Sequence, residues 1–403
     1  MLATSAGLGF YGLGVYLSTL NRVRGFSISG MSGATAVFFI ASGFAGVGIA
    51  KLLRLIDPRP IVIVGALVAA AALVVLGRVT SLWQVYIVYG LFGVGYAATA
   101  LVVSTTLVAR WFDRRRASAL SIASTGLSVG GIVFTPLARA WLDDRSLASA
   151  TTRIALLYVA GVIPAAVVLL RPDPAAFGFG PDGTTLTPKQ RSGESVPTKA
   201  GMLYANAIRS IEFRLITITF VLALAAQVGA IAQLVKLAEE RISDAPTAGR
   251  VVSLLAACSV TGRLLAGFLL TRVGNRRFSL VVIWFQAIAI GSLAFAHGTA
   301  AVFVAAACFG LAVGNILLLH PLLLAGEFGV ADYPRIFGRS QFFTTWGVAA
   351  GPFLFGWLRD HAGGYRTSYL VGAAISTVGA LTYGSLKPRA AEGEAAADIA
   401  ATA

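Results

Sequence analysis

Long apolar runs alternate with short polar connections along almost the whole chain. Each run holds about 20 residues, and a helix of that length crosses the roughly 30 Å hydrocarbon core of a bilayer. We therefore predict an all-α membrane protein. Its twelve transmembrane helices are expected near residues 1–20, 31–50, 60–79, 85–108, 117–140, 153–170, 213–235, 251–271, 278–296, 301–325, 337–358 and 368–386.

Polar segments divide the predicted helices into two sets of six. Residues 171–212, rich in Pro, Gly, Thr and Ser, have the composition of a cytoplasmic linker. This predicts an N-terminal six-helix bundle at 1–170 and a C-terminal six-helix bundle at 213–386. Residues 387–403 are expected to form a disordered tail. The first twenty residues lack the basic start and cleavage site of a signal peptide, so we expect a retained first helix.

A repeated pattern relates the fifth predicted helix to the eleventh. Five positions of the fifth helix recur in the eleventh with one constant offset, which indicates that the halves are pseudo-symmetric copies. Parallel repeats of this kind place a substrate site between the halves, near the middle of the bilayer. The matching positions are Gly131, Pro136, Trp141, Leu142 and Asp144 in the first half and Gly347, Pro352, Trp357, Leu358 and Asp360 in the second.

The composition agrees with a polytopic membrane protein. Of 403 residues, 57% are hydrophobic and 12% charged, and the formal net charge is +15. The basic residues lie in short connections instead of one face or tail, so we expect contact with the lipid bilayer and no nucleic acid partner. If both termini lie in the cytoplasm, most of these basic residues lie on the cytoplasmic side of the membrane, as the positive-inside rule requires. We expect a multi-pass protein of the plasma (bacterial inner) membrane.

No motif typical of an enzyme is present. The stretch GLGFYGLG in the first helix follows no strand and so is not a dinucleotide-binding loop. His297 and His361 lie near helix ends, and no Cys/His cluster has the spacing of a metal site. We predict that the protein is not an enzyme and uses no cofactor and no metal.

Arg263 interrupts an apolar run, SLLAACSVTGRLLAGFLLTRVGNRR (Ser253 to Arg277). A charge at the centre of a membrane helix costs about 2.5–3.5 kcal/mol on insertion scales, so it usually faces a partner or a wet cavity. A guanidinium binds a carboxylate bidentately and stays charged at physiological pH. Arg263 is therefore predicted to bind a small organic anion. Alternatively, it caps neighbouring carbonyls or pairs at a helix end to hold a closed gate.

The segment that follows Arg263 resembles the signature loop of the major facilitator superfamily. GFLLTRVGNRR carries Thr271 where that family usually has an acid, and the equivalent AKLLRLIDPRP has Ala50 for the first Gly and Arg54 at the acid position. The resemblance implies twelve helices in two six-helix bundles and a transport function. The residues it assigns to gating are Gly267, Arg272, Gly274, Arg276 and Arg277.

Within that superfamily the chain resembles the monocarboxylate transporters and the bacterial oxalate/formate antiporters. The resemblance lies in ARWFDRRRASALSIASTGLSVGG, whose basic cluster includes Arg115 and Arg116, in RPDPAAFGFGPDG and in GLAVGNILLLHPLLLAGEFG. It implies that Arg263, four residues before Gly267, binds the substrate carboxylate. The chain departs from animal relatives in having Ser259 in place of an aspartate and no lysine in residues 1–20.

Further polar side chains are expected on the helices that line the cavity in this superfamily. His320 lies at a depth similar to Arg263 and could titrate near neutral pH, or it could simply pack on a helix face. The remaining candidates for hydrogen bonds to a small acid are Tyr11, Tyr16, Tyr89, Tyr96, Gln227, Gln233 and Asn315.

These patterns together predict a carrier of small organic monocarboxylates that works by alternating access, with Arg263 as the anion site. Coupling of transport to a proton is kept as an open alternative, with the proton as a second partner beside the substrate anion. The alternatives are an exporter of hydrophobic drugs or other small molecules, and a membrane receptor or scaffold that transports nothing.

Overall fold

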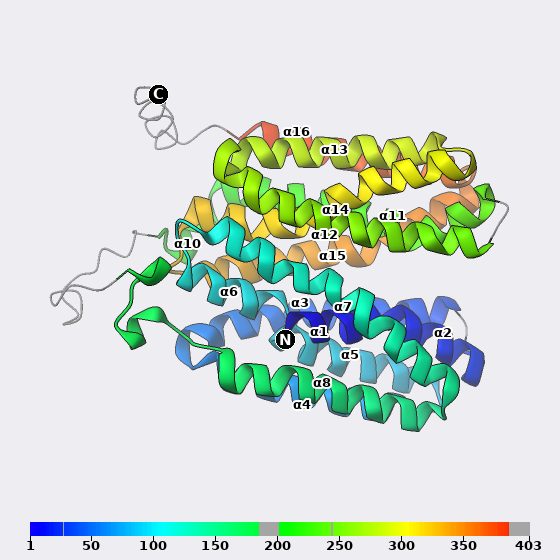
Figure 1. Cartoon of the computed structure of the whole chain (residues 1–403), viewed down its shortest axis with the longest axis horizontal. Helices are drawn as coiled ribbons and strands as arrows, with labels where there is room; N and C mark the ends of the chain where they lie inside the picture. Colours follow the sequence, from blue (N-terminus) through cyan, green and yellow to red (C-terminus); the bar gives the residue numbers. More distant parts are fainter. Residues whose placement is uncertain (27, 185–200, 243–244, 387–403) are drawn as a thin grey trace.

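Twelve helical segments run side by side in the computed structural model, which describes residues 1–26, 28–184, 201–242 and 245–386 (Figure 1). The first six are α1–η1–α2 (Leu2–Ser5, Ala6–Phe10 and Gly12–Arg24), α3 (Ile28–Leu55), α4 (Pro58–Leu76), α5–α6 (Leu82–Thr99 and Leu101–Trp111), α7 (Arg116–Asp144) and α8 (Leu147–Leu169). The second six are α11 (Ile211–Arg241), α12 (Ala245–Val273), α13 (Asn275–Phe295), α14 (Gly298–Phe328), α15 (Tyr333–His361) and α16 (Tyr365–Gly384).

Most helices extend beyond the apolar runs that predicted them. For example, α12 starts at Ala245 where the apolar run starts at 251, because a helix continues into the polar interface after its apolar residues end. Nine segments in the described part of the chain are long and apolar enough to cross a membrane by composition alone. The others are the interrupted first segment and the more polar α15 and α16, which run alongside those nine.

The connection between the two sets of helices is partly folded. It contains two short 3-10 helices, η2 (Pro174–Phe177) and η3 (Pro181–Gly183), and one helical turn, α10 (Tyr204–Ala207). Residues 185–200 of the predicted linker and the predicted tail at 387–403 lie outside the described residues. The division into folding units at 1–170 and 213–386 remains a prediction.

Small residues allow neighbouring helices to pack closely, as is usual where no water drives association. At Gly95 of α5, a Cβ atom would lie 2.6 Å from the carbonyl oxygen of Gly65 and 2.9 Å from the Cα of Ala69, both on α4. Any larger residue at this position would therefore push α4 and α5 apart.

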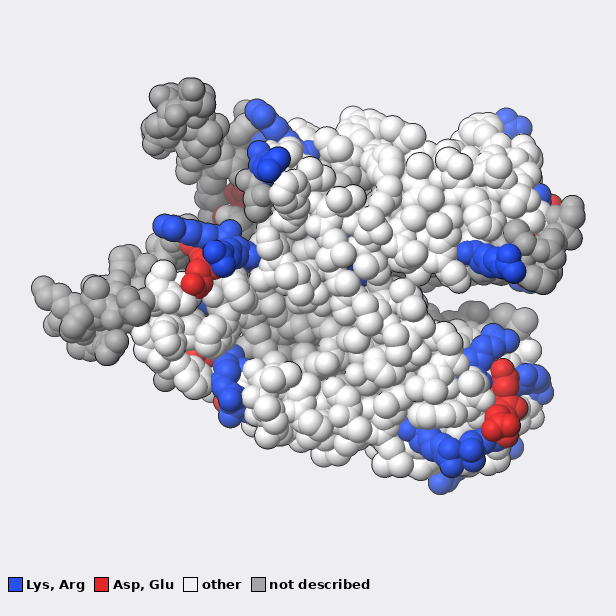
Figure 2. Space-filling view, in the orientation of Figure 1, with Lys and Arg blue, Asp and Glu red and all other residues white. Residues whose placement is uncertain are grey.

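The two sets of helices meet chiefly through α3 with α15 and α7 with α12, and to a lesser extent through α7 with α14 and α6 with α15. These contacts lie toward the end of the molecule that carries η2, η3 and α10, which we call the linker end (Figure 1). At the opposite end, which we call the mouth end, Figure 2 shows a hollow between the two halves. Charged side chains gather at both ends of this view, and an uncharged band separates them, as expected for a bilayer-spanning surface.

Candidate functional site

Arg263 lies at the junction of the two halves and has no exposed surface. Its Nε donates to the carbonyl oxygen of Gly314 on α14 at 2.8 Å. Its Nη1 donates across the junction to α7, to the carbonyl oxygen of Ser124 at 3.0 Å and to the Oγ of Ser128 at 2.6 Å. Nη2 is buried without a hydrogen-bond partner, and Arg263 forms no ion pair with a carboxylate in the described part of the chain.

A row of serines on α7 faces α12 around Arg263. Ser118 donates to the carbonyl oxygen of Gly267 at 3.1 Å, and Ser121 donates to the carbonyl oxygen of Arg263 itself. Spacings of three or four residues keep these hydroxyls on one face of α7. The small-residue stretch after the basic cluster therefore forms a polar seam between the halves, with the predicted anion-binding residue inside it.

Gly314 is a functional position that the sequence analysis did not select. A Cβ atom there would overlap the carbonyl oxygen of Ser259 and would lie 3.0 Å from the Cγ of Arg263. The missing side chain lets the Arg263 stem cross α14 on its way to α7. The signal available in the sequence was the pair of glycines in GLAVGN, which alone does not indicate what packs against them.

The first helix is interrupted beside this junction. Residues Ala6–Phe10 form a π-helical turn, which often marks a functional site. The hydroxyl of Tyr16 donates to the carbonyl oxygen of Leu8 at 2.7 Å, and Thr135 donates to that of Gly7 at 3.1 Å. Tyr16, predicted as a substrate contact, therefore bonds the irregular turn and is 1% exposed.

The fourth helix is interrupted at the same level as the start of the first. Between α5 and α6, Ala100 has φ −106° and ψ −141°, which are not helical values. Ser5 donates to the carbonyl oxygen of Thr99 at 3.1 Å, and the hydroxyls of Thr99 and Tyr158 lie 2.7 Å apart. The Ser5 hydroxyl thus bonds a backbone carbonyl at the interruption, as irregular backbone in a membrane requires.

Tyr11 and Tyr96 connect the interrupted helices to Arg263. Tyr11 lies between η1 and α2 and is close enough to interact electrostatically with both Arg263 and Tyr96. Tyr96 packs against Phe38, with ring centroids 5.2 Å apart, and keeps 9% of its surface exposed. Of the four tyrosines considered from the sequence, Tyr89 is fully buried. Tyr11 and Tyr96 remain the tyrosine candidates for contact with a ligand.

His320 lies within the second half, among the side chains of α11 and α15. Its Nε2 is 2.8 Å from the Oγ of Ser340, which lies 2.9 Å from the Oγ1 of Thr217. The imidazole stacks on Phe220 at 4.7 Å and contacts Phe337 at 5.2 Å. With 2% of its surface exposed, His320 occupies a packed position and is not among the contacts of Arg263.

The amide candidates lie in different surroundings. Asn315, next to Gly314, donates from Nδ2 to the carbonyl oxygen of Leu311 at 2.8 Å and leaves Oδ1 buried without a partner. Gln227 has a buried, unpartnered Oε1. The Oε1 of Gln233 accepts from the hydroxyl of Tyr365 at 3.2 Å near the mouth end. Asn315 and Gln227 therefore retain hydrogen-bonding capacity, whereas the carbonyl of Gln233 is occupied.

Residues of the second signature loop lie at the linker end. Gly274 has φ 78°, a conformation that favours glycine, and it precedes the first turn of α13. Arg272 stacks on Phe268 with its Cζ 4.3 Å from the ring centroid, and Arg276 donates to the carbonyl oxygen of Leu386. Arg277 is exposed. These contacts stay within the second half.

The first signature loop joins the two halves instead. Arg54 forms an ion pair with Asp332, which precedes α15 and is only 8% exposed in its side chain. Asp332 also accepts from the backbone N–H of Tyr204 in α10 at 2.9 Å. Arg54 stands where the family usually has an acid, and it pairs with an acid of the other half. We call this an ion pair of reversed polarity.

The basic cluster before α7 contacts the start of the linker. The carboxylate of Asp182 accepts from the backbone N–H groups of Asp113, Arg114 and Arg115 at 3.2, 2.8 and 3.4 Å. Arg116 turns back to the carbonyl oxygen of Phe112 and to the carboxylate of Asp113. Arg115 and Arg116 therefore belong to a connection that is fastened to the linker.

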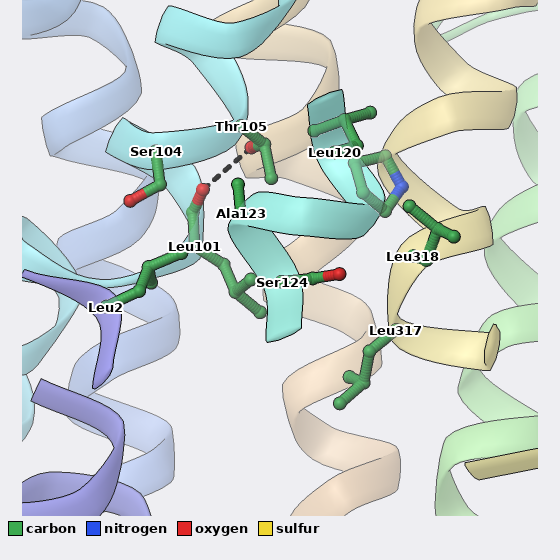
Figure 3. Close-up of a pocket in the computed structure, with 10 residues that line it drawn as sticks. Leu2, Leu101, Ser104, Thr105, Leu120, Ala123, Ser124, Leu317 and Leu318 are labelled. Atoms are coloured by element: carbon green, nitrogen blue, oxygen red, sulfur yellow. Dashed lines mark hydrogen bonds between the residues drawn. The ribbon is translucent and has the colours of Figure 1, made fainter. Parts of the chain in front are cut away.

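A small pocket lies between the halves, next to the Arg263 contacts (Figure 3). Ser124, whose carbonyl accepts from Arg263, lines it. Ser104 contributes a buried hydroxyl without a partner, whereas Thr105 donates to the carbonyl oxygen of Leu101 at 2.7 Å. Most of the lining is aliphatic: Leu2, Leu101, Leu120, Ala123, Leu317, Leu318 and Pro321.

Comparison with known proteins identifies the family. The sequence profile of the Major Facilitator Superfamily matches residues 1–235 and, in a second match, residues 202–399. The chain belongs to the Major Facilitator Superfamily. This membership confirms the resemblance drawn from the signature loops, and transporters of this family are not enzymes.

Curated members of the superfamily with similar sequences include monocarboxylate transporters. Rat monocarboxylate transporter 13 is 25% identical over 334 residues, covering 80% of this chain and 72% of the relative. Mouse monocarboxylate transporter 11 is 26% identical over 345 residues, covering 82% and 73%. The agnestins efflux protein AgnL12 of Paecilomyces divaricatus is 27% identical over 281 residues, covering 68% and 60%.

Solved structures of the superfamily share the fold. The E. coli fucose:proton symporter FucP aligns with a TM-score of 0.66 at 15% identity, over 94% of this chain and 97% of that one. The human organic anion transporter MFSD10 aligns with a TM-score of 0.67 at 14% identity, over 95% and 98%. The predicted all-α membrane fold is therefore confirmed, and the chain is a multi-pass membrane transporter.

Proposed function

We propose that the protein carries small organic monocarboxylates by alternating access, with Arg263 as the carboxylate site. The observation that supports this most strongly is the surroundings of Arg263: a buried guanidinium at the junction of the halves, with Nη2 unpartnered and no carboxylate paired to it among the described residues. A buried charge is costly without a counter-charge. A substrate anion supplies that charge.

The contacts of Arg263 also couple binding to movement. We infer that the substrate carboxylate binds at Nη2, while Nη1 is held by Ser124 and Ser128 of the other half. When the linker end opens, α7 leaves α12 and Nη1 loses both acceptors. The same carboxylate then accepts from both nitrogens in the bidentate geometry that guanidinium favours. Substrate binding thus strengthens as the halves part, which is the differential affinity that drives a conformational change.

The chemistry of the site favours a single negative charge. Arg263 supplies one positive charge, and no carboxylate pairs with it among the described residues, so one negative charge on the substrate balances it. Relatives named monocarboxylate transporters agree with this substrate class. The Tyr11 and Tyr96 hydroxyls can donate further hydrogen bonds to the carboxylate, and Asn315 Oδ1 can accept one from a hydroxyl group of the acid.

We infer that transport proceeds without the proton site expected from animal relatives. Ser259 stands where those proteins have an aspartate, and its Oγ lies 3.4 Å from that of Ser128. Neither hydroxyl titrates in the physiological range. Exchange or facilitated diffusion is therefore the proposed mode, and an imposed pH gradient is expected to leave the final accumulation unchanged.

The chain is proposed to lie in the plasma (bacterial inner) membrane with both termini cytoplasmic, so that the linker end faces the cytoplasm. Among the described residues, Lys and Arg are more numerous in the connections at the linker end, which include Arg54, Arg114 and Arg115, than in those at the mouth end. The positive-inside rule supports this orientation. Impermeant labelling of single cysteines introduced at the two ends tests it in intact cells.

Export of larger apolar molecules is the second candidate function. The aliphatic lining of the pocket and the similarity to an efflux protein support it. In that case Arg263 is structural and holds α7 against α12 through Ser124 and Ser128.

Counterflow in proteoliposomes tests the proposed function. Vesicles are loaded with one unlabelled acid, and entry of labelled lactate, pyruvate, formate or oxalate is followed for the wild type, Arg263→Gln and the control Arg250→Gln. Arg250 is on the same helix and is exposed. We expect accumulation by the wild type and the control, and about 100-fold less by folded Arg263→Gln. Equal transport by all three contradicts the assignment of Arg263, and failure of every acid favours the efflux function.

A further inference from the structure

Lys51 and Arg339 are exposed at the linker end, one on each half of the protein. Lys51 lies near the end of α3, which is at Leu55, and Arg339 lies near the start of α15, which is at Tyr333. At about 1.5 Å per residue, both are within roughly 10 Å of a helix end, where hydrocarbon gives way to lipid headgroups. Neither forms an ion pair with a described residue, and the Cζ of Arg339 lies 5.2 Å from the ring centroid of Phe343.

The packing of α3 on α15 places these two cations on the same side of the seam between the halves. The helices touch at Ala50 and Gly338, since a Cβ atom on Gly338 would lie 2.6 Å from the Cβ of Ala50. At this seam α3 runs toward the linker end and α15 runs away from it. In an antiparallel pair, the residue after each contact residue turns to the same side, so Lys51 and Arg339 project together.

Burial identifies this side as the outer face of the seam. Ile49 and Phe337, which precede the contact residues, are 7% and 0% exposed and turn toward the protein interior. Lys51 and Arg339, which follow the contact residues, are exposed. Packed helices have axes about 8–10 Å apart, so two long side chains that project together can reach one group. The two cations therefore face the headgroup layer of the bilayer as a pair.

Large apolar side chains continue from the cations toward the middle of the bilayer. Phe44 and Phe342 pack edge to face across the seam with ring centroids 4.9 Å apart, and the ring of Trp346 lies 6.3 Å from that of Phe342. Phe44 is 60% exposed and Trp346 is 46% exposed. Gly48, between Phe44 and Lys51, leaves open space, because a Cβ atom there would meet no atom within 4 Å. Two cations beside an exposed apolar surface match the two ends of a phospholipid.

The other charged side chains at this end of the seam already have partners. Asp332 pairs with Arg54 and accepts from the backbone N–H of Tyr204. Arg335 lies over the ring of Tyr204, with its Cζ 4.1 Å from the ring centroid. The two exposed cations therefore keep their charge without a counter-charge from the described residues, and a ligand with a negative headgroup would supply one.

We propose that the outer face of the α3–α15 seam binds one anionic phospholipid. Lys51 and Arg339 hold its headgroup, and an acyl chain lies along Phe44 and Trp346. A zwitterionic lipid brings a cation of its own to the site, which the two basic side chains repel, so the site selects a headgroup with net negative charge. Because the two cations belong to different halves, the site is complete only while α3 and α15 are packed together. The inference is independent of the substrate and of the role of Arg263.

Quenching of Trp346 fluorescence by brominated lipids tests the site. Trp346 lies about 10 Å deeper than Arg339 along α15, so bromine atoms partway along an acyl chain reach its depth. The protein is reconstituted in phosphatidylcholine vesicles with increasing shares of brominated phosphatidylglycerol or brominated phosphatidylcholine. The signal of Trp346 is the difference between each protein and the same protein with Trp346→Phe. We expect half-maximal quenching at an about fivefold lower share of the brominated phosphatidylglycerol.

Charge-matched variants separate a site from general attraction to a basic protein. Lys51→Gln with Arg339→Gln is expected to abolish the difference between the two lipids, and each single replacement should remove most of it, because both halves contribute. The control, Arg114→Gln with Arg209→Gln, removes two exposed charges at the same end but away from the seam and should keep the difference. Equal quenching by both lipids in the wild type, a preference that survives the double replacement, or its equal loss in the control overturns the proposal.

Discussion

The two ends of the junction between the halves are held by different kinds of interaction. At the linker end, α7 serines and Arg263 donate to backbone carbonyl oxygens, and Asp332 is nearly buried beneath Arg54. At the mouth end, half-exposed ion pairs remain within each half, Arg22 with Asp143 and Glu240 with Arg359. Buried hydrogen bonds depend on exact helix spacing, whereas exposed ion pairs tolerate changes. Changes in side-chain size are therefore expected to affect the linker end, which is closed, and changes in charge to affect the mouth end, which is open.

The largest effect is expected from forcing the closed end apart. Ser121→Leu places a bulky side chain against the backbone of Arg263, and overpacking of this kind costs about 1–3 kcal/mol. We expect the linker end to open about tenfold more often. The rate at which a thiol reagent added at the linker end labels S104C measures this opening. The protein used for labelling has Cys258 and Cys308 replaced by serine. Ile122→Leu, on the exposed face of α7, is the control and should leave the labelling rate unchanged. An unchanged rate in Ser121→Leu would show that the serine seam does not hold the linker end closed.

A smaller effect is expected at the crossing of Arg263 over α14. Gly314→Ala pushes the Ser259 backbone and the Arg263 side chain away from α14 and weakens the bonds of Arg263 to Ser124 and Ser128. Transport should fall about fivefold, in line with a cost of about 1 kcal/mol, the low end for overpacking. Gly326→Ala is the matched control on the same helix, because the nearest atom to its Cβ, the Nδ2 of Asn275, lies at 3.8 Å. Equal transport by both variants would show that the crossing is not constrained.

The ion pair of Arg54 and Asp332 should contribute less. Arg54 is 41% exposed, so solvent screening reduces the pair to about 1 kcal/mol of coupling. A double-mutant cycle with Arg54→Ala and Asp332→Ala, read by thermal unfolding, measures this coupling. Asp332→Ala alone should cost more than Arg54→Ala, since Asp332 also accepts from Tyr204. Additive effects would argue against a reversed-polarity gate.

The smallest effect is expected from the mouth-end pairs on folding stability. Asp143→Asn should leave the free energy of unfolding nearly unchanged, because the pair is exposed and screened by water. Any remaining difference from the wild type should shrink as salt is added, because salt screens exposed charges. Chemical denaturation measures it beside Asp332→Asn. A loss as large as that of Asp332→Asn would remove the contrast between the two ends.

The sequence predicted the helices well because hydrocarbon thickness imposes one length on every crossing. It also selected Arg263, since a lone charge in an apolar run stands out without any knowledge of neighbours. It could not select Asp332 as the partner of Arg54, because the two are far apart in the chain and only packing of α3 on α15 brings their ends together. The π-helical turn at Ala6–Phe10 has no distinct sequence pattern, so the bond from Tyr16 to the carbonyl oxygen of Leu8 could not be predicted.

That π-helical turn has a genetic consequence. Such a turn holds one more residue than an α-helical turn would, as the bond from Tyr11 N–H to the carbonyl oxygen of Ala6 shows. Loss of a single codon within Ala6–Phe10 would restore regular α-helix and rotate α2 by about 100° relative to α1. Tyr16 and Arg22 would then swing to new neighbours together. One in-frame deletion would thus alter the turn near the site and the ion pair at the mouth, with no residue substituted.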